Sequence, residues 1–208
     1  MRLFLALDID DAIRERIAVF LNGVRGFAPE ARWAKPESLH VTLKFIGEKP
    51  DEFVQSLKEP LGGLRGAPIE LSFRGYGFFP TPKSPRVFWI GIQAGAELGK
   101  LAAAVDDIAS KLGVAKEDHA FSPHLTLARR GGRSGAPGRQ KGDGPNRDFQ
   151  KLQEKLSALP ALDFGSMTAR DFYLYRSQLA PGGSRYTKLE HFPLSAGKSA
   201  AGNDSPNL

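Results

Sequence analysis

The chain has 208 residues, 41% apolar and 25% charged, which is typical of one soluble globular domain or of two small lobes sharing one core. It contains no cysteine, which excludes disulfides, thiolate zinc sites and cysteine nucleophiles together. No apolar run approaches the ~20 residues of a membrane helix, and the apolar stretch at residues 1–8 is too brief for a signal peptide. We therefore expect a cytoplasmic protein that does not contact membranes.

The net charge of +6 is distributed unevenly. Segment 129–147 holds six basic residues against one acidic residue, so the rest of the chain is nearly neutral. Glycine and proline are frequent there and large apolar residues are almost absent, so we expect a mobile basic loop near 130–147. Such a loop is either a solvated segment kept soluble by its charge or an arm that attracts RNA.

In chain order, apolar periodicity predicts two similar series of elements. The first half predicts strand, helix, strand, helix and strand at residues 2–7, 12–24, 39–46, 53–64 and 69–79. The second half repeats this order and adds a last strand, at residues 86–92, 98–112, 124–129, 148–159, 168–176 and 185–192. Asp10 or Asp11 can cap the first helix, and the prolines between residues 80 and 85 force a loop.

An order of elements that occurs twice indicates an internal duplication. The fold class that follows is α+β, with two pseudo-symmetric, antiparallel-rich sheets and outer helices around a central cleft. We expect residues 1–194 to form a single bilobal domain of two interleaved lobes. Residues 195–208 should form a flexible tail.

Two of the four histidines stand in the same setting. Residues 38–45 read SLHVTLKF and residues 122–129 read SPHLTLAR, so His40 and His124 each have serine two before and threonine two after. On a strand, residues two apart share a face. Each motif therefore presents an imidazole and a hydroxyl to the cleft, while its apolar residues pack toward the helices. We expect Phe45 in the core as well, the alternative being an aromatic ring near the cleft that stacks on a base.

Two such motifs on opposite sides of one point suit an in-line displacement at phosphorus. One histidine takes a proton from the attacking water, and the other gives a proton to the departing oxygen. The hydroxyls of Thr42 and Thr126 can hold the non-bridging oxygens, where negative charge develops. No metal is needed, and a chain without cysteine and without an HExxH motif is a poor candidate for zinc. The remaining histidines, His119 and His191, are expected in solvent or in packing.

These motifs, HVTL at 40–43 and HLTL at 124–127, make the sequence resemble the 2H phosphoesterases. Within that superfamily the sequence is most similar to the LigT-like RNA 2′,3′-cyclic phosphodiesterases, over roughly residues 1–194. The supporting stretches lie at residues 2–7, 32–33, 43–48, 77–80, 122–123 and 181–186. The segment at 130–147 departs from the family pattern.

The resemblance implies that residues 1–194 are a catalytic domain without metal or cofactor, which hydrolyses RNA 2′,3′-cyclic phosphate ends to 2′-phosphates. It implies that His40 is the proton donor to the leaving 3′ oxygen and that His124 is the proton acceptor from water. A weak 2′–5′ RNA ligase side activity is also compatible with it.

The family tends to carry a basic residue just after the second motif, which here matches Arg129 and implies a substrate contact. Strand alternation argues against this role, because Arg129 lies five residues after His124 and should face the apolar side. A strand end, bulge or turn at residues 130–132 could redirect it.

Two other functions stay open on the sequence alone. The first is an RNA-binding module without turnover, and the second is a phosphodiesterase that acts on a small cyclic nucleotide. In each case the partner is RNA with a 2′,3′-cyclic phosphate end or a cyclic nucleotide, and we expect a monomer. Two titratable groups aimed at one point favour the enzyme.

Overall fold

The computed structural model describes residues 1–131, 147–180 and 183–194. Their strands and α-helices are, in chain order, β1 (Arg2–Asp8), α1 (Asp11–Val24), β2 (Arg32–Trp33), β3 (His40–Glu48), α2 (Phe53–Gly62), β4 (Ile69–Thr81), β5 (Ser84–Ala94), α3 (Ala96–Lys111), β6 (His124–Arg129), α4 (Arg147–Ser157), β7 (Asp163–Ala169), β8 (Asp171–Ala180) and β9 (Gly183–Pro193). Most of the predicted basic loop and all of the predicted tail lie outside the described residues.

The strands form two antiparallel sheets, as the predicted α+β class requires. One sheet has the order β3-β1-β8-β9 and the other the order β2-β6-β5-β4-β7. The two histidine motifs therefore open strands of different sheets, β3 in the four-stranded sheet and β6 in the five-stranded sheet.

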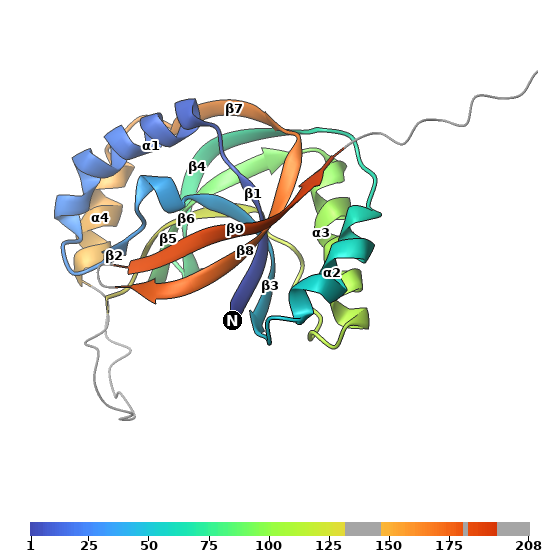
Figure 1. The fold of residues 1–208 in the computed structure, drawn as a ribbon. Helices are drawn as coiled ribbons and strands as arrows, with labels where there is room; N and C mark the ends of the chain where they lie inside the picture. Colours follow the sequence, from blue (N-terminus) through green and yellow to red (C-terminus); the bar gives the residue numbers. More distant parts are fainter. Residues whose placement is uncertain (132–146, 181–182, 195–208) are drawn as a thin grey trace, which may run out of the picture.

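The helices cover the sheets in two pairs, and Figure 1 shows α1 and α4 on one side of the molecule and α2 and α3 on the other. Helix α1 follows β1 of the four-stranded sheet but packs against β7 of the five-stranded sheet. Helix α3 follows β5 of the five-stranded sheet but contacts β3 of the four-stranded sheet. Helices α1 and α3 thus each cross to the sheet that the preceding strand does not join, and the two lobes are interleaved along the chain.

Each sheet has one face in the main core and one face that carries a histidine. On β1, Leu3, Leu5 and Leu7 belong to the main core, whereas Phe4 and Ala6 form a separate small cluster with Tyr175 on the other face. We call the faces that carry His40 and His124 the histidine faces. Because successive strand residues alternate between faces, the leucines of β1 bring the sheet onto its helices and leave the histidine face open for polar and aromatic groups.

Three sequence predictions need correction. The predicted proline loop is a tight hairpin, because β4 and β5 pair as far as Pro80 with Pro85 and Thr81 with Ser84. The prolines fit at the end of this ladder, where the register shifts and few amide donors are needed. Asp10 is the N-cap residue of α1, but its side chain makes no capping hydrogen bond. The strand predicted at 168–176 is the end of β7 joined to the start of β8.

None of the helices in the described part of the chain is both long and apolar enough to cross a membrane.

Candidate active site

The same hydrogen bond holds both histidines. The Nδ1 atom of His40 lies 2.8 Å from the carbonyl oxygen of Ser38, and Nδ1 of His124 lies 2.8 Å from that of Ser122. A carbonyl oxygen only accepts, so Nδ1 carries the proton in both rings and donates it. Each Nε2 atom is therefore free to exchange a proton with a substrate. The shared residue two before each histidine thus acts through its backbone, a contact that sequence reasoning missed.

A β-bulge interrupts the alternation of β3 directly after the first motif. Thr42 pairs with Ala6 and Lys44 pairs with Leu5, so Leu43 is an extra residue opposite β1. Leu43 and Lys44 are consequently both buried, and Phe45 pairs with Phe4 on the histidine face. The side chain of Phe45 is 54% exposed. Its prediction as a core residue is therefore wrong, because the bulge reverses the face on which it lies.

Strand β6 has a bulge at the equivalent place. Thr126 pairs with Trp89 and Ala128 pairs with Phe88, so Leu127 is the extra residue. Leu127 and Ala128 are both buried, and Arg129 is exposed. This bulge removes the objection that alternation raised against Arg129, since it turns the fifth residue after His124 back to the histidine face.

One guanidinium links the two histidines electrostatically. Burial lowers the pKa of His40 and of His124 below the ordinary value, and the Arg129 charge lowers both further. The carbonyls of Ser38 and Ser122 oppose these effects. Because β3 also contacts β6, the two imidazoles and Arg129 lie around one region although they come from different sheets.

Asp8 supports His40 from the neighbouring strand. It pairs with His40 in the β1–β3 ladder, and its charge raises the pKa of that imidazole. Burial of Asp8 would disfavour its ionised form, but hydrogen bonds from Lys188 and from the backbone N–H of Ile9 keep the pKa of the carboxyl below its ordinary value. Arg14 also donates to Asp8 at 2.8 Å. Asp8 is therefore an ionised neighbour of His40, and among the residues that the structure describes no carboxylate has the same effect on His124, whose ladder partner is Gly91.

Aromatic rings surround each imidazole. Around His40, the ring centroids of Phe4, Tyr186 and Tyr175 lie at 4.7, 5.0 and 6.2 Å. Around His124, those of Phe79 and Trp89 lie at 5.0 and 6.2 Å. These rings desolvate the histidines, which accounts for the dominant effect of burial on their pKa values. Sequence analysis did not single them out.

The ring of Trp89 occupies the space that a side chain at position 77 would fill. A Cβ atom at Gly77 would come within 2.1 Å of the Trp89 ring. The glycine is therefore required for the close approach of the indole that stands beside His124.

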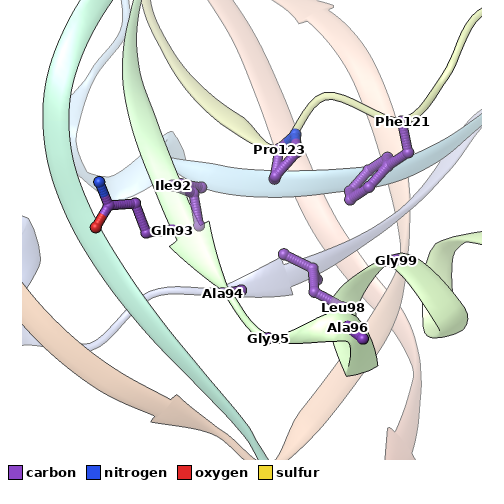
Figure 2. A pocket seen from close by; sticks show the side chains of 9 residues that line it. All are labelled: Ile92, Gln93, Ala94, Gly95, Ala96, Leu98, Gly99, Phe121 and Pro123. Carbon is purple, nitrogen blue, oxygen red and sulfur yellow. The ribbon is translucent and has the colours of Figure 1, made fainter.

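Other features of the described residues do not join this site. His119 is exposed, and Nε2 of His191 contacts Asp171 at 2.6 Å. No group of three or more His, Asp or Glu side chains in the described ranges could hold a metal ion. A pocket of about 370 Å³ lies beside the second motif, where Figure 2 shows Phe121 and Pro123 over Ile92 and Leu98, but neither catalytic candidate lines it.

A fold with one His-x-Thr strand in each of two interleaved sheets defines a phosphoesterase of the 2H type. The family model described as LigT like phosphoesterase matches residues 7–89 and again residues 90–186, so each match contains one motif. The chain belongs to this family.

Relatives agree along nearly the whole length. A protein named RNA 2′,3′-cyclic phosphodiesterase from Archaeoglobus fulgidus is 38% identical over 192 residues, which cover 92% of this chain and 99% of that protein. One of the same name from Methanothermobacter thermautotrophicus is 34% identical and covers 93% of this chain and 99% of its own length. The crystal structure of E. coli LigT complexed with 3′-AMP has a TM-score of 0.72 at 29% identity, covering 93% of this chain and 97% of that one.

The pKa values of the two histidines provide a test of the site geometry. Both should titrate below about 6.5 in NMR spectra of the free protein. Arg129→Gln removes a cation that disfavours both imidazolium ions, so both pKa values should rise together. Arg130→Gln, which removes the same charge from the next exposed position, is the matched control and should shift them less. A response of only one histidine to Arg129→Gln would contradict the shared position of the guanidinium.

Substitution of Gly77 tests the packing beside His124. Gly77→Ala should lower the free energy of unfolding by about 1–3 kcal/mol, because the added methyl group must displace the Trp89 ring. Gly99→Ala is the control, since its Cβ meets nothing within 4 Å in α3, and it should raise stability by about 0.5–1 kcal/mol. Urea unfolding followed by tryptophan fluorescence measures both effects. Equal stability of Gly77→Ala and the natural protein would show that the indole is not confined there.

Proposed function

We propose that the chain is a metal-independent phosphodiesterase that opens the 2′,3′-cyclic phosphate at the end of an RNA and leaves a 2′-phosphate. Water attacks phosphorus in line with the 3′ oxygen, a new P–O bond forms and the P–O3′ bond breaks. The proton of the water passes to Nε2 of His124, and a proton on Nε2 of His40 passes to the 3′ oxygen. The products are a 2′-phosphate and a 3′-hydroxyl, and the two imidazoles exchange protons with solvent before the next turnover.

The surroundings of the two histidines favour this division of roles. Asp8 favours the protonated form of His40, as a proton donor requires. Burial lowers the pKa of both imidazoles, and Asp8 opposes this effect at His40, whereas His124 pairs in the ladder with a glycine in place of a carboxylate. Acid and base steps of this kind each contribute roughly 10²–10⁴-fold to the rate.

The other residues of the histidine faces complete the proposal. The hydroxyls of Thr42 and Thr126, each on the same face as its histidine, donate to the non-bridging oxygens of the phosphate. The exposed guanidinium of Arg129 offsets the charge of the same group. The exposed ring of Phe45 offers a surface on which a base can stack.

The single observation that carries the proposal is the matched pair of imidazoles, each held through Nδ1 by a backbone carbonyl and both within reach of one arginine. The names of the relatives from A. fulgidus and M. thermautotrophicus support the substrate.

Removal of either imidazole should nearly abolish turnover. His40→Ala and His124→Ala should each lower kcat by about 10²–10⁴-fold, and the double variant should be little worse, because acid and base act as a unit. Thr42→Ala and Thr126→Ala should cost less, and His119→Ala is the exposed control. The assay follows an oligonucleotide with a 2′,3′-cyclic phosphate end in EDTA, with products identified by phosphorus NMR.

Near-normal turnover after loss of either histidine would remove the pair from the mechanism. Activity lost in EDTA and restored by zinc or manganese would contradict a reaction without metal. Tight RNA binding by the natural protein without any product would favour the binding module.

A substrate with sulfur in place of the bridging 3′ oxygen separates the proton donor from the proton acceptor. Thiolate leaves without protonation far more readily than alkoxide, so this substrate makes the general acid dispensable. His40→Ala should then recover most of the natural rate, while His124→Ala should remain slow because the water still needs a base. Recovery by His124→Ala alone would reverse the two roles.

A further inference from the structure

Lys44 is the one charged side chain that is buried in the described part of the chain, with 2% of its surface exposed. Alternation would place it on the histidine face, two residues after Thr42. The bulge at Leu43 turns it to the opposite face, toward α3. A buried ammonium is costly unless its donors are paired, so its partners show what the position requires.

The ammonium of Lys44 lies close to three oxygen atoms. Its Nζ atom lies 2.6 Å from Oδ1 of Asp106, 2.7 Å from the carbonyl oxygen of Ala115 and 3.0 Å from Oε1 of Glu117. Asp106 belongs to α3, which covers the four-stranded sheet. Ala115 and Glu117 belong to the connection between α3 and β6.

This connection, residues 112–123, ends at the second motif. It contains no helix or strand, and it includes Ser122, whose carbonyl accepts from Nδ1 of His124. Its last residues, Phe121 and Pro123, lie over the pocket of about 370 Å³ shown in Figure 2. Packing beneath that end is therefore incomplete.

We propose that Lys44 is a positioning residue for His124. Lys44 lies on β3, the strand of the first motif, and holds the start of the connection in position. The connection in turn positions the Ser122 carbonyl, which orients the imidazole of His124. Lys44 touches neither histidine, and its effect passes from Nζ through Ala115 and Glu117 to Ser122. The inference rests on the proposed function, since it assigns His124 a task that needs a fixed ring.

The two acidic partners of Lys44 make it possible to distinguish this positioning role from a role in which Lys44 only anchors α3 to the sheet. Glu117→Gln weakens the contact to the connection, whereas Asp106→Asn weakens the contact to the helix. Both substitutions keep the side-chain volume. The Glu117 side chain is 54% exposed and that of Asp106 only 19%, so anchoring alone predicts that Asp106→Asn does more harm in every measurement.

The first measurement is the pKa of His124, determined by NMR titration without substrate. Lys44→Met is compared with the natural protein, and Lys100→Met is the control at an exposed position of α3. Simple loss of a cation would raise the pKa of a nearby histidine. Displacement of the Ser122 carbonyl has the opposite sign, because that hydrogen bond raises the pKa of His124. We expect the pKa of His124 to fall in Lys44→Met and in Glu117→Gln and to stay in place in Lys100→Met and Asp106→Asn.

The second measurement is turnover of the cyclic-phosphate oligonucleotide. Lys44→Met should lower kcat about 10–100-fold, with KM nearly unchanged, since small misplacements of a reacting group cost rate rather than binding. Glu117→Gln should lower kcat in the same direction, and more than Asp106→Asn does. If Lys44→Met does not fold, the comparison of Glu117→Gln with Asp106→Asn decides alone.

The proposal is overturned if His124 titrates as in the natural protein in both Lys44→Met and Glu117→Gln, or if Asp106→Asn lowers kcat as much as Glu117→Gln. The titration needs no substrate, so it is independent of the proposed function. Absence of hydrolysis by the natural protein would instead refute the proposed function and leave the titration result standing.

Discussion

The arrangement of the site depends on the extra residue that directly follows the threonine in each histidine strand. An ordinary strand would place the fourth residue after each histidine on the histidine face and the fifth in the core. The bulges at Leu43 and Leu127 exchange these positions. Lys44 and Ala128 turn inward, while Phe45 and Arg129 turn outward. The unpaired residue of a bulge weakens the ladder locally, and here that cost is accompanied by the placement of the Phe45 ring and the Arg129 cation on the histidine faces.

The β-bulge has the same effect in both motifs, but the residues that it repositions are different. The shared parts are the histidine, the threonine, the bulge and the carbonyl two residues before the ring. The motifs differ in the residues that follow the bulge. On the histidine face, β3 carries the Phe45 ring and β6 carries the Arg129 guanidinium. On the core side, β3 carries the Lys44 ammonium and β6 carries the Ala128 methyl group. In the proposed reaction, a substrate between the two motifs would meet the Phe45 ring from one sheet and the Arg129 charge from the other. The two sides of the site therefore differ in chemistry, although their histidines and threonines are alike.

The sequence was sufficient for the fold class and for the order of most elements, because leucine and isoleucine spacing records which face of each element is buried. It was also sufficient to single out His40 and His124, since a repeated phrase is visible without any contacts. It could not give the bulges, because they are a property of the hydrogen-bond register between two strands. The errors about Phe45 and the doubt about Arg129 have this common origin. The partners of Lys44 were out of reach for a related reason: they lie far along the chain, and only packing brings them together. The monomeric state, the 1–194 domain boundary and the ligase side activity stay predictions.

The crossing of the helices has a consequence for how such a molecule can be divided. Helix α1 is encoded with the first sheet but completes the core of the second, and α3 does the reverse. Strands β8 and β9, from the end of the chain, pair beside β1, from its beginning. A cut between the two sequence repeats would therefore leave each fragment with strands whose apolar faces have lost their cover. Neither of the two halves that the family model matches, residues 7–89 and 90–186, is thus a unit that covers its own apolar faces.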